Sequence, residues 1–421
     1  MFRCVNPPAG LLLVATVMLL ASSAPADQPD FDRLPAGWSL ERHDVVPADQ
    51  AAAIGRRLGG EVVGLTNSLL RVDGRQFKVN VVSCAGARDA RRVEQALLKA
   101  HGGMRAFVLR RGSEVIEFSG ADHRVARRAP YVLGLRPQRV VYRVTFDAAP
   151  LKSADYMSWN DLFEAFLALA AHPEDAAARA RIEELRPAFG FADVLTLRKH
   201  GLGKARSDYS FEPQPVKRTG SRRSDLLTFT FGDLPPRAGV PRVRVTATVE
   251  CEAFADSPTR RQPGAALVAP TRRWPSDDPE IGRLAGEITA GCRGDEQKVQ
   301  ALLDWLMPGR NIRFGGPVTG SRYGVLKVLE QGFGHCWDFS DLFVTLCRAS
   351  GVPARQVAGW LYGQCGHVWA EVHLTGHGWR QVDPTDGMAC GNEHIPYLTS
   401  EDGEMTLVYL SRPAIEVLRE E

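Results

Sequence analysis

The sequence predicts an α+β protein of several domains, and three observations support this fold class. The chain has 421 residues, and single hydrophobic cores stop growing at about 250–300 residues, so two or three domains are expected. Its composition, 44% hydrophobic and 24% charged residues, is that of a globular protein. Alternating strand patterns dominate the first two thirds, whereas helical patterns open the last third.

The first two predicted domains cover residues 27–128 and 129–262. In the first, a small α/β unit, EVVGLTNSLLRV, QFKVNVVS, MRAFVLRR and SEVIEFSG are strand-like, and ARDARRVEQALLKAHGG is a helix that stops at its two glycines. The second is mainly β, with strands in RVVYRVTFD, DLLTFTFGD and PRVRVTATVECEAF. A helical insertion at about 158–200 interrupts it, because the apolar positions there follow helical spacing.

The third predicted domain covers residues 270–400, and residues 401–421 form a C-terminal tail. DPEIGRLAGEIT and DEQKVQALLDWLM are helices, and each opens with Asp. A further helix begins close to Cys336, with its apolar side chains on one face. The segments HVWAEVHL and WRQVD then predict a hairpin around GHG.

Residues 1–26 have the three parts of a secretory signal peptide: one positive charge, the apolar run LLLVATVMLL, and small residues up to Ala26. The run is about half the roughly 20 residues of a spanning helix, so the mature chain is expected to be soluble, without a transmembrane segment, and secreted or periplasmic. Its formal charge of +3 becomes +2 without this segment, because Arg3 is the only charged residue there. A net charge this small does not indicate a nucleic-acid partner.

Cysteine usage leaves a free thiol in the mature chain. Beyond Cys4 the cysteines are Cys84, Cys251, Cys292, Cys336, Cys347, Cys365 and Cys390. The number is odd, so at least one thiol is unpaired or pairs with another molecule, while six could form three disulfides, one of them between Cys365 and Cys390. Cys365, His367, Cys390 and His394 could in principle hold a metal. The CxxC spacing of structural zinc is absent, so no metal or other cofactor is expected.

Cys336 is the candidate nucleophile. Gly332 and Gly334 let the preceding backbone turn tightly and leave the cysteine approachable. At a helix start, unpaired N–H groups and the macrodipole favour a thiolate and can hold an oxyanion. Cys347 lies on the apolar face of the same helix and is expected to be a core thiol or disulfide member.

The partners of Cys336 are expected in the hairpin. Alternation places His367 on one strand face with Trp369 and His373. If His373 pairs with Trp379, Asp383 lies opposite Trp369 and diagonal to His367; a one-residue slip points Asp383 away. In the first register, Cys336, His367 and Asp383 supply a nucleophile, a base and an orienting carboxylate.

The segments GHCWDFSDLFVTLCRASGVPARQVAGW, HVWAEV and WRQVDPTD resemble the three successive motifs of the transglutaminase-like superfamily, whose core is a papain-like fold. Their cysteine, histidine and aspartate are spaced by 31 and 16 residues, and the resemblance covers roughly residues 275–395. It implies that Cys336 accepts the acyl group, His367 is the base and Asp383 its partner. It also implies attack on a carboxamide, a thioester intermediate, and transfer to an amine or to water.

Other site residues and two alternatives accompany this resemblance. Tyr323 stands near the position where animal transglutaminases have an oxyanion-stabilising Trp, and Trp337 and Trp369 are candidates to contact the substrate. No calcium-type acidic loop is present. The expected partner is a peptide or protein carboxamide, with cell-envelope components as further candidates. The alternatives are a cysteine peptidase or amidase of the same fold, and a non-catalytic envelope binding or scaffold protein.

Overall fold

The computed structural model describes residues 28–102, 104–198, 209–220, 226–257, 263–364 and 366–421. The expected signal peptide and Cys365 lie outside the described residues. The chain divides into two compact units, residues 1–137 and 138–421. The expected boundary at residue 128 falls inside helix α3 (His123–Val132), whose Ala126 and Ala129 are buried in the core of the first unit.

The first unit is an antiparallel sheet with helices, as expected for an α/β unit. Its sheet runs in the order β1-β2-β3-β5-β4. The elements besides α3 are β1 (Trp38–Val45), α1 (Ala48–Leu58), β2 (Val62–Val72), β3 (Arg75–Cys84), α2 (Ala87–Ala100), β4 (Val108–Arg111) and β5 (Glu114–Ser119). The four expected strands and the helix over α2 are confirmed. Elements β1, α1 and α3 were not among the expected ones.

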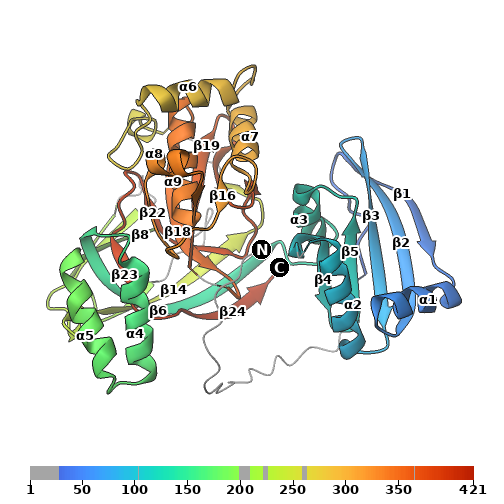
Figure 1. Ribbon diagram of the computed structural model, residues 1–421, viewed down its shortest axis with the longest axis horizontal. Helices are drawn as coiled ribbons and strands as arrows, with labels where there is room; N and C mark the ends of the chain where they lie inside the picture. Colours follow the sequence, from blue (N-terminus) through green and yellow to red (C-terminus); the bar gives the residue numbers. More distant parts are fainter. Residues whose placement is uncertain (1–27, 103, 199–208, 221–225, 258–262, 365) are drawn as a thin grey trace. The chain divides into compact units, whose positions relative to one another are not determined.

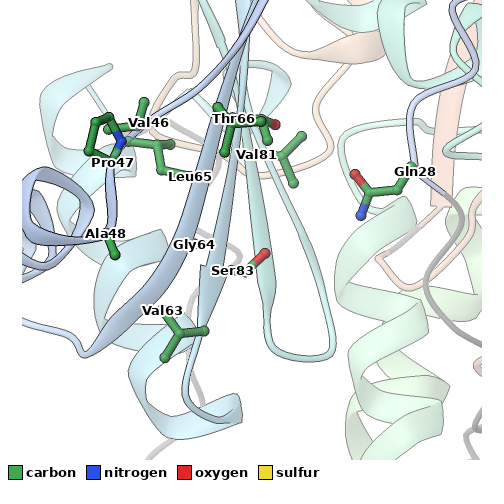
Figure 2. Close-up of a pocket in the computed structure, with 11 residues that line it drawn as sticks. Gln28, Val46, Pro47, Ala48, Val63, Gly64, Leu65, Thr66, Val81 and Ser83 are labelled. Carbon is green, nitrogen blue, oxygen red and sulfur yellow. The ribbon is translucent and has the colours of Figure 1, made fainter.

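An open groove of about 440 Å³ lies in the first unit at the start of α1 (Figure 2). Most of its lining is apolar, including Val46, Pro47, Leu65 and Val81. Its lining residues carry no titratable side chain. The groove therefore offers mostly apolar surface, with the hydroxyls of Thr66 and Ser83 among its few polar groups.

The second unit begins with long antiparallel strands. Strand β6 (Arg139–Ala154) pairs with β14 (Val243–Glu252), which also pairs with β9 (Tyr209–Glu212). The insertion contains α4 (Trp159–Ala171) and α5 (Ala176–Leu185), then β7 (Phe189–Phe191) and β8 (Val194–Arg198). The helical part of the insertion is thus shorter than expected, because residues 194–198 form strand β8 instead of helix. The side chains of β8 alternate between buried and half-buried positions. Strand β8 forms a sheet with β10 (Lys217–Thr219) and β11 (Leu226–Thr230). Two short strands, β12 (Pro236–Arg237) and β13 (Val240–Pro241), pair with each other.

The remainder of this unit places helices against a second antiparallel sheet. Its helices are α6 (Pro279–Ile288), α7 (Asp295–Leu306), α8 (Val325–Gln331) and α9 (Cys336–Ala349). The sheet runs β15 (Asp256–Ser257), β20 (Gly378–Asp383), β19 (Gly366–Leu374), β18 (Ala354–Leu361) and β22 (His394–Ser400), with β21 (Met388–Ala389) beside β20. Short strands β16 (Arg313–Phe314) and β17 (Phe333–Gly334) pair in parallel. Helix α9 packs on β18 and β19 (Figure 1).

Two expected boundaries are absent from this unit. Residues 138–262 and 270–400 belong to one compact unit, and one apolar core contains Phe146 of β6 together with Trp360 of β18. The expected tail is also structured: β23 (Leu407–Tyr409) and β24 (Ala414–Glu420) both pair with β6. Both differences arise from long-range strand pairing.

None of the helices in the described residues is long and apolar enough to cross a membrane.

Candidate active site

Helix α9 begins at Cys336, as expected. Gly332 ends the preceding helix in the left-handed region, with φ 70°, and a Cβ on Gly334 would lie 2.5 Å from the Cβ of Asp338. His335 and Asp338 cap the helix start reciprocally, and the His335 N–H donates to the Asp338 carboxylate at 3.0 Å. Cys336 is half-buried and forms no disulfide. Its thiol therefore lies at the positive end of the α9 dipole.

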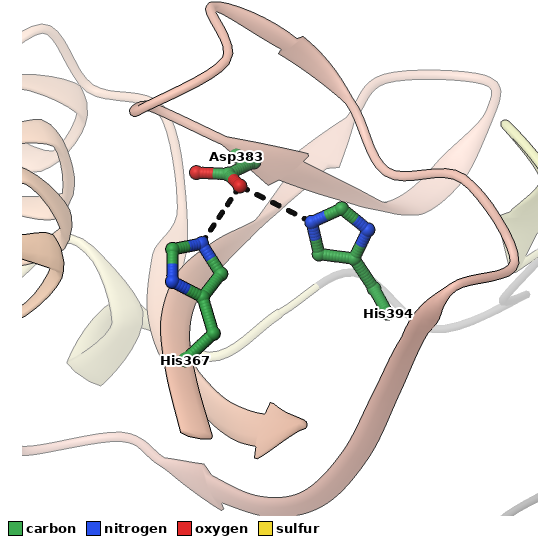
Figure 3. Close-up of side chains that lie close together, drawn as sticks. All are labelled: His367, Asp383 and His394. Atoms are coloured by element: carbon green, nitrogen blue, oxygen red, sulfur yellow. Dashed lines mark hydrogen bonds and ion pairs between the residues drawn. The ribbon is translucent and has the colours of Figure 1, made fainter. Parts of the chain in front are cut away.

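The hairpin adopts the register that brings His367 and Asp383 together. His373 pairs with Trp379 and Ala370 with Val382, so the first of the two expected registers is confirmed. His367 Nε2 and Asp383 Oδ2 lie 2.8 Å apart. Figure 3 shows the two side chains pointing toward each other. Both side chains are buried. In this register, side-chain alternation places the Asp383 carboxylate beside the His367 imidazole.

The His367 and Asp383 charges stabilise each other despite burial. Burial alone would lower the pKa of His367, but the charge and hydrogen bond of Asp383, with a hydrogen bond to the Cys336 side chain, raise that pKa well above its ordinary value. Burial would raise the pKa of Asp383, but His367 and His394 hold it well below its usual range. Because His367 uses Nε2 for Asp383, its Nδ1 is left for the Cys336 sulfur. This geometry suits acyl transfer through a thiolate and an imidazolium.

Two further residues bind Asp383. Its Oδ1 accepts hydrogen bonds from the Thr385 N–H at 2.8 Å and the Thr385 hydroxyl at 2.7 Å. His394 Nε2 lies 3.1 Å from Oδ2. A turn residue two positions after an Asp is a local signal that could have identified Thr385. His394 is brought in by the pairing of Leu361 with His394 across β18 and β22, which local sequence does not show.

Tyr323 lies beside the start of α9 through its backbone. Its N–H donates to the Asp338 carboxylate at 2.7 Å, and its ring packs against Phe333. The Tyr323 hydroxyl is buried and has no hydrogen-bond partner within the described residues. Such a hydroxyl retains its donor for another group.

The tryptophans expected to contact substrate are packing residues. Trp369 is fully buried, with its Nε1–H donating to Gln381 at 2.8 Å, so no substrate can reach its ring. Trp337 is 7% exposed and packs edge-on against Tyr156 and Trp159. Both rings stabilise the elements that carry Cys336 and His367, and Trp369 leaves no face for an acyl chain.

A buried ion-pair cluster supports strand β19 beyond His367. Glu371 lies between Arg198 of β8 and Arg355 of β18, with N–O distances of 2.6 Å to each. Burial alone would raise the pKa of Glu371, but the two arginines lower it to about 2. The strand that presents His367 is therefore held through Glu371 by residues from two other strands.

No disulfide is present among the described residues. Cys84, Cys251, Cys292, Cys336 and Cys347 form no disulfide, and the pairing of Cys390 with Cys365 involves a residue outside the described ones. Cys347 is fully buried on the core face of α9. Its burial raises the pKa of the thiol well above its ordinary value.

Of the four residues that could in principle hold a metal, Cys365 lies outside the described residues, so that set is not tested. Cys390 packs with Val357 and Trp369. His367, Asp383 and His394 place their ligand atoms within 4.8 Å of one another.

The fold and this constellation define a transglutaminase-like domain. Residues 282–384 match the family model of the transglutaminase-like superfamily, so this part of the chain belongs to that superfamily. The match spans Cys336, His367 and Asp383 and confirms the resemblance found in the sequence motifs.

Other proteins are similar to parts of the chain. The Bacillus subtilis protein YebA is 31% identical over 137 residues, which are 27% of this chain and 18% of YebA. A proposed cysteine protease from Cytophaga hutchinsonii is similar in structure, with a TM-score of 0.41 and 15% identity over 68% of this chain and 92% of that one. The periplasmic domain of Pseudomonas aeruginosa TgpA is similar with a TM-score of 0.30 and 15% sequence identity, and the match covers 59% of this chain and 90% of that domain. The chain thus spans under a fifth of YebA.

Proposed function

We propose that the protein is an exported cysteine enzyme of the transglutaminase-like class that forms a thioester on Cys336 from a peptide or protein carboxamide. The observation that carries the proposal is the chain of contacts from Cys336 through His367 to Asp383. A disulfide would block this chemistry, and Cys336 forms none. The expected signal peptide supports export to the periplasm or the exterior.

In the first half-reaction, the Cys336 thiolate attacks the carboxamide carbon. The carbonyl oxygen becomes an oxyanion, for which N–H groups at the start of α9 and the Tyr323 hydroxyl are the candidate donors. His367, protonated on Nδ1, passes this proton to the leaving nitrogen as the C–N bond breaks. Asp383 stabilises the imidazolium through Nε2 and keeps the ring oriented.

In the second half-reaction, an amine or water attacks the thioester. Neutral His367 takes the proton of the attacking group, and the Cys336 sulfur leaves as thiolate. Transfer and hydrolysis share every protein group named here and differ only in which nucleophile reaches the thioester. Products, not site residues, therefore distinguish a transglutaminase from an amidase or peptidase.

The test incubates the mature protein with a dansylated amine and a Gln-containing protein. Amine incorporation or ammonia release is expected for the wild type and for Cys347→Ala, which removes the buried thiol of the same helix. Both signals should vanish in Cys336→Ala. Equal wild-type and Cys336→Ala behaviour, with no labelling of Cys336 by a thiol probe, would refute the catalytic proposal and favour a binding or scaffold role.

A further inference from the structure

Asp383 is held by a second histidine that lies outside the sequence-predicted triad. His394 is the first residue of β22, and its side chain is 1% exposed. Its Nε2 lies 3.1 Å from Asp383 Oδ2, the oxygen that also contacts His367 (Figure 3). Asp383 therefore lies between two imidazoles carried by different strands of one sheet.

The carboxylate of Asp383 has its full complement of donors. An ionised carboxylate offers about four lone-pair positions. Thr385 occupies two of them through its N–H and hydroxyl, His367 a third and His394 the fourth. Without His394, Oδ2 would keep only the His367 donor, and the orientation of the carboxylate would depend on that contact and on the Thr385 bonds to Oδ1.

The surroundings of His394 select one tautomer. Its Nδ1 is buried without a hydrogen-bond partner in the described part of the chain, and the nearest acid, Glu393, is 3.8 Å from it. A proton on Nδ1 would therefore lack a hydrogen-bond acceptor, whereas a proton on Nε2 has Asp383. The Trp369 ring packs edge-on against the imidazole, with centroids 5.2 Å apart. These contacts point the Nε2–H at Asp383 Oδ2.

We propose that His394 is a positioning residue that fixes the Asp383 carboxylate against His367 and so makes Cys336 reactive. The inference rests on the proposed function, because it gives His394 a role in the same acyl transfer. His394 acts through Asp383 and needs no contact with substrate. The triad is thereby extended to Cys336, His367, Asp383 and His394.

A bound metal is the competing explanation for this cluster, because the ligand atoms of His367, Asp383 and His394 lie within 4.8 Å of one another. The two short distances, 2.8 and 3.1 Å, both end on one oxygen and are hydrogen-bond lengths. Ligands about 2.0–2.1 Å from a tetrahedral zinc are roughly 3.3 Å apart. The contacts thus fit hydrogen bonding better, and the test includes a zinc arm.

The experiment measures the second-order rate of Cys336 alkylation by iodoacetamide, together with kcat and KM for amine incorporation. His394→Phe keeps a ring beside Trp369 but removes the N–H donor, whereas His394→Gln keeps an N–H near the Nε2 position. The matched control is His373→Gln, which changes another buried histidine of the same sheet that faces Trp379. Thermal unfolding is recorded for every variant. If His394→Phe does not fold, the pair His394→Gln and His394→Asn makes the same comparison, because the shorter Asn amide does not reach Asp383.

We expect His394→Phe to lose roughly ten- to hundredfold in both alkylation rate and kcat, with KM within about twofold. His394→Gln and His373→Gln should stay near wild type. Wild-type rates in a folded His394→Phe or His394→Asn protein would overturn the inference, as would loss of the wild-type alkylation rate in EDTA and its recovery with Zn²⁺. Fast, His394-dependent alkylation without amide turnover would instead refute the proposed function and leave the positioning role standing.

Discussion

Replacing Asp383 with Asn tests the electrostatic core of the site. The oxygen 2.8 Å from His367 Nε2 loses its charge, while the shape and the Thr385 contacts can be kept. Unit charges at that distance interact by about 6 kcal/mol at an effective dielectric constant of 20, before the cost of burial. A hydrogen bond to a charged group contributes about 1.5–3 kcal/mol net. The net loss should lie between these two figures and near the lower one, because burial offsets much of the attraction. We expect about 3–4 kcal/mol less transition-state stabilisation, or roughly a 10²- to 10³-fold lower kcat/KM.

The same substitution should shift the pH dependence in a defined direction. Burial lowers and Asp383 raises the pKa of His367, and the balance leaves that pKa well above its ordinary value. The imidazolium therefore persists as pH rises and is lost only when pH passes the raised pKa. Without the Asp383 charge the pKa falls, so the basic limb of the kcat/KM profile moves to lower pH.

The assay is amine incorporation followed from pH 5 to 10 in wild type, Asp383→Asn and Asp386→Asn. Asp386 lies in the same turn, and its backbone N–H, which donates to the Asp383 carbonyl at 3.1 Å, is unchanged by the substitution. The control should follow the wild-type profile. If Asp383→Asn keeps wild-type kcat/KM, or its basic limb does not move to lower pH, the assigned role of Asp383 is wrong.

Three further predictions concern the support of the site. Glu371→Gln should cost about 3–5 kcal/mol in urea unfolding at pH 7, because Arg198 and Arg355 both lose the charge of their shared buried carboxylate; in the wild type the folded-state pKa of about 2 keeps this contribution present above about pH 4.5 and removes it as pH falls toward 2, so the two proteins should converge in stability there. Gly359→Ala should cost about 1–3 kcal/mol or more in thermal unfolding, because its Cβ would collide with the Ile395 carbonyl oxygen and the Trp369 ring; unchanged stability would contradict that packing. A fragment of residues 270–400 should show no cooperative urea transition, whereas residues 138–421 should, because β6 and β14 supply part of the core; equal midpoints for both fragments would contradict a shared core.

Local patterns were sufficient to place two of the candidate residues on their elements. Cys336 lies at a helix start that glycines and an apolar face define, and Asp383 follows from side-chain alternation once the register is fixed. The register itself was left open between two alternatives, because a turn around Gly376 is compatible with both. In the structure His373 pairs with Trp379, which establishes the register.

The remaining support could not be predicted from local patterns because it depends on long-range pairing. His394 reaches Asp383 only because β22 adds to the far side of β18. The local sequence of residues 401–421 predicts a tail, because the strands β23 and β24 form only by pairing with the distant strand β6. The burial of Trp369 could not be predicted from the sequence pattern either. Alternation shows on which face of the strand a side chain lies, but not which other residues cover that face.

Arg198 connects the region before residue 262 to the sheet that carries His367. A buried ion pair contributes little net stability, because desolvation offsets much of its attraction, but breaking it is costly and its geometry is directional. Arg198 comes from β8, and its guanidinium binds both oxygens of Glu371, four residues after His367 on the same strand face. Displacement of β8 would remove one of the two arginines that bind the buried Glu371 and leave only Arg355. Strand β8 therefore adds a side-chain contact to β19, which is otherwise held by its pairing with β18 and β20.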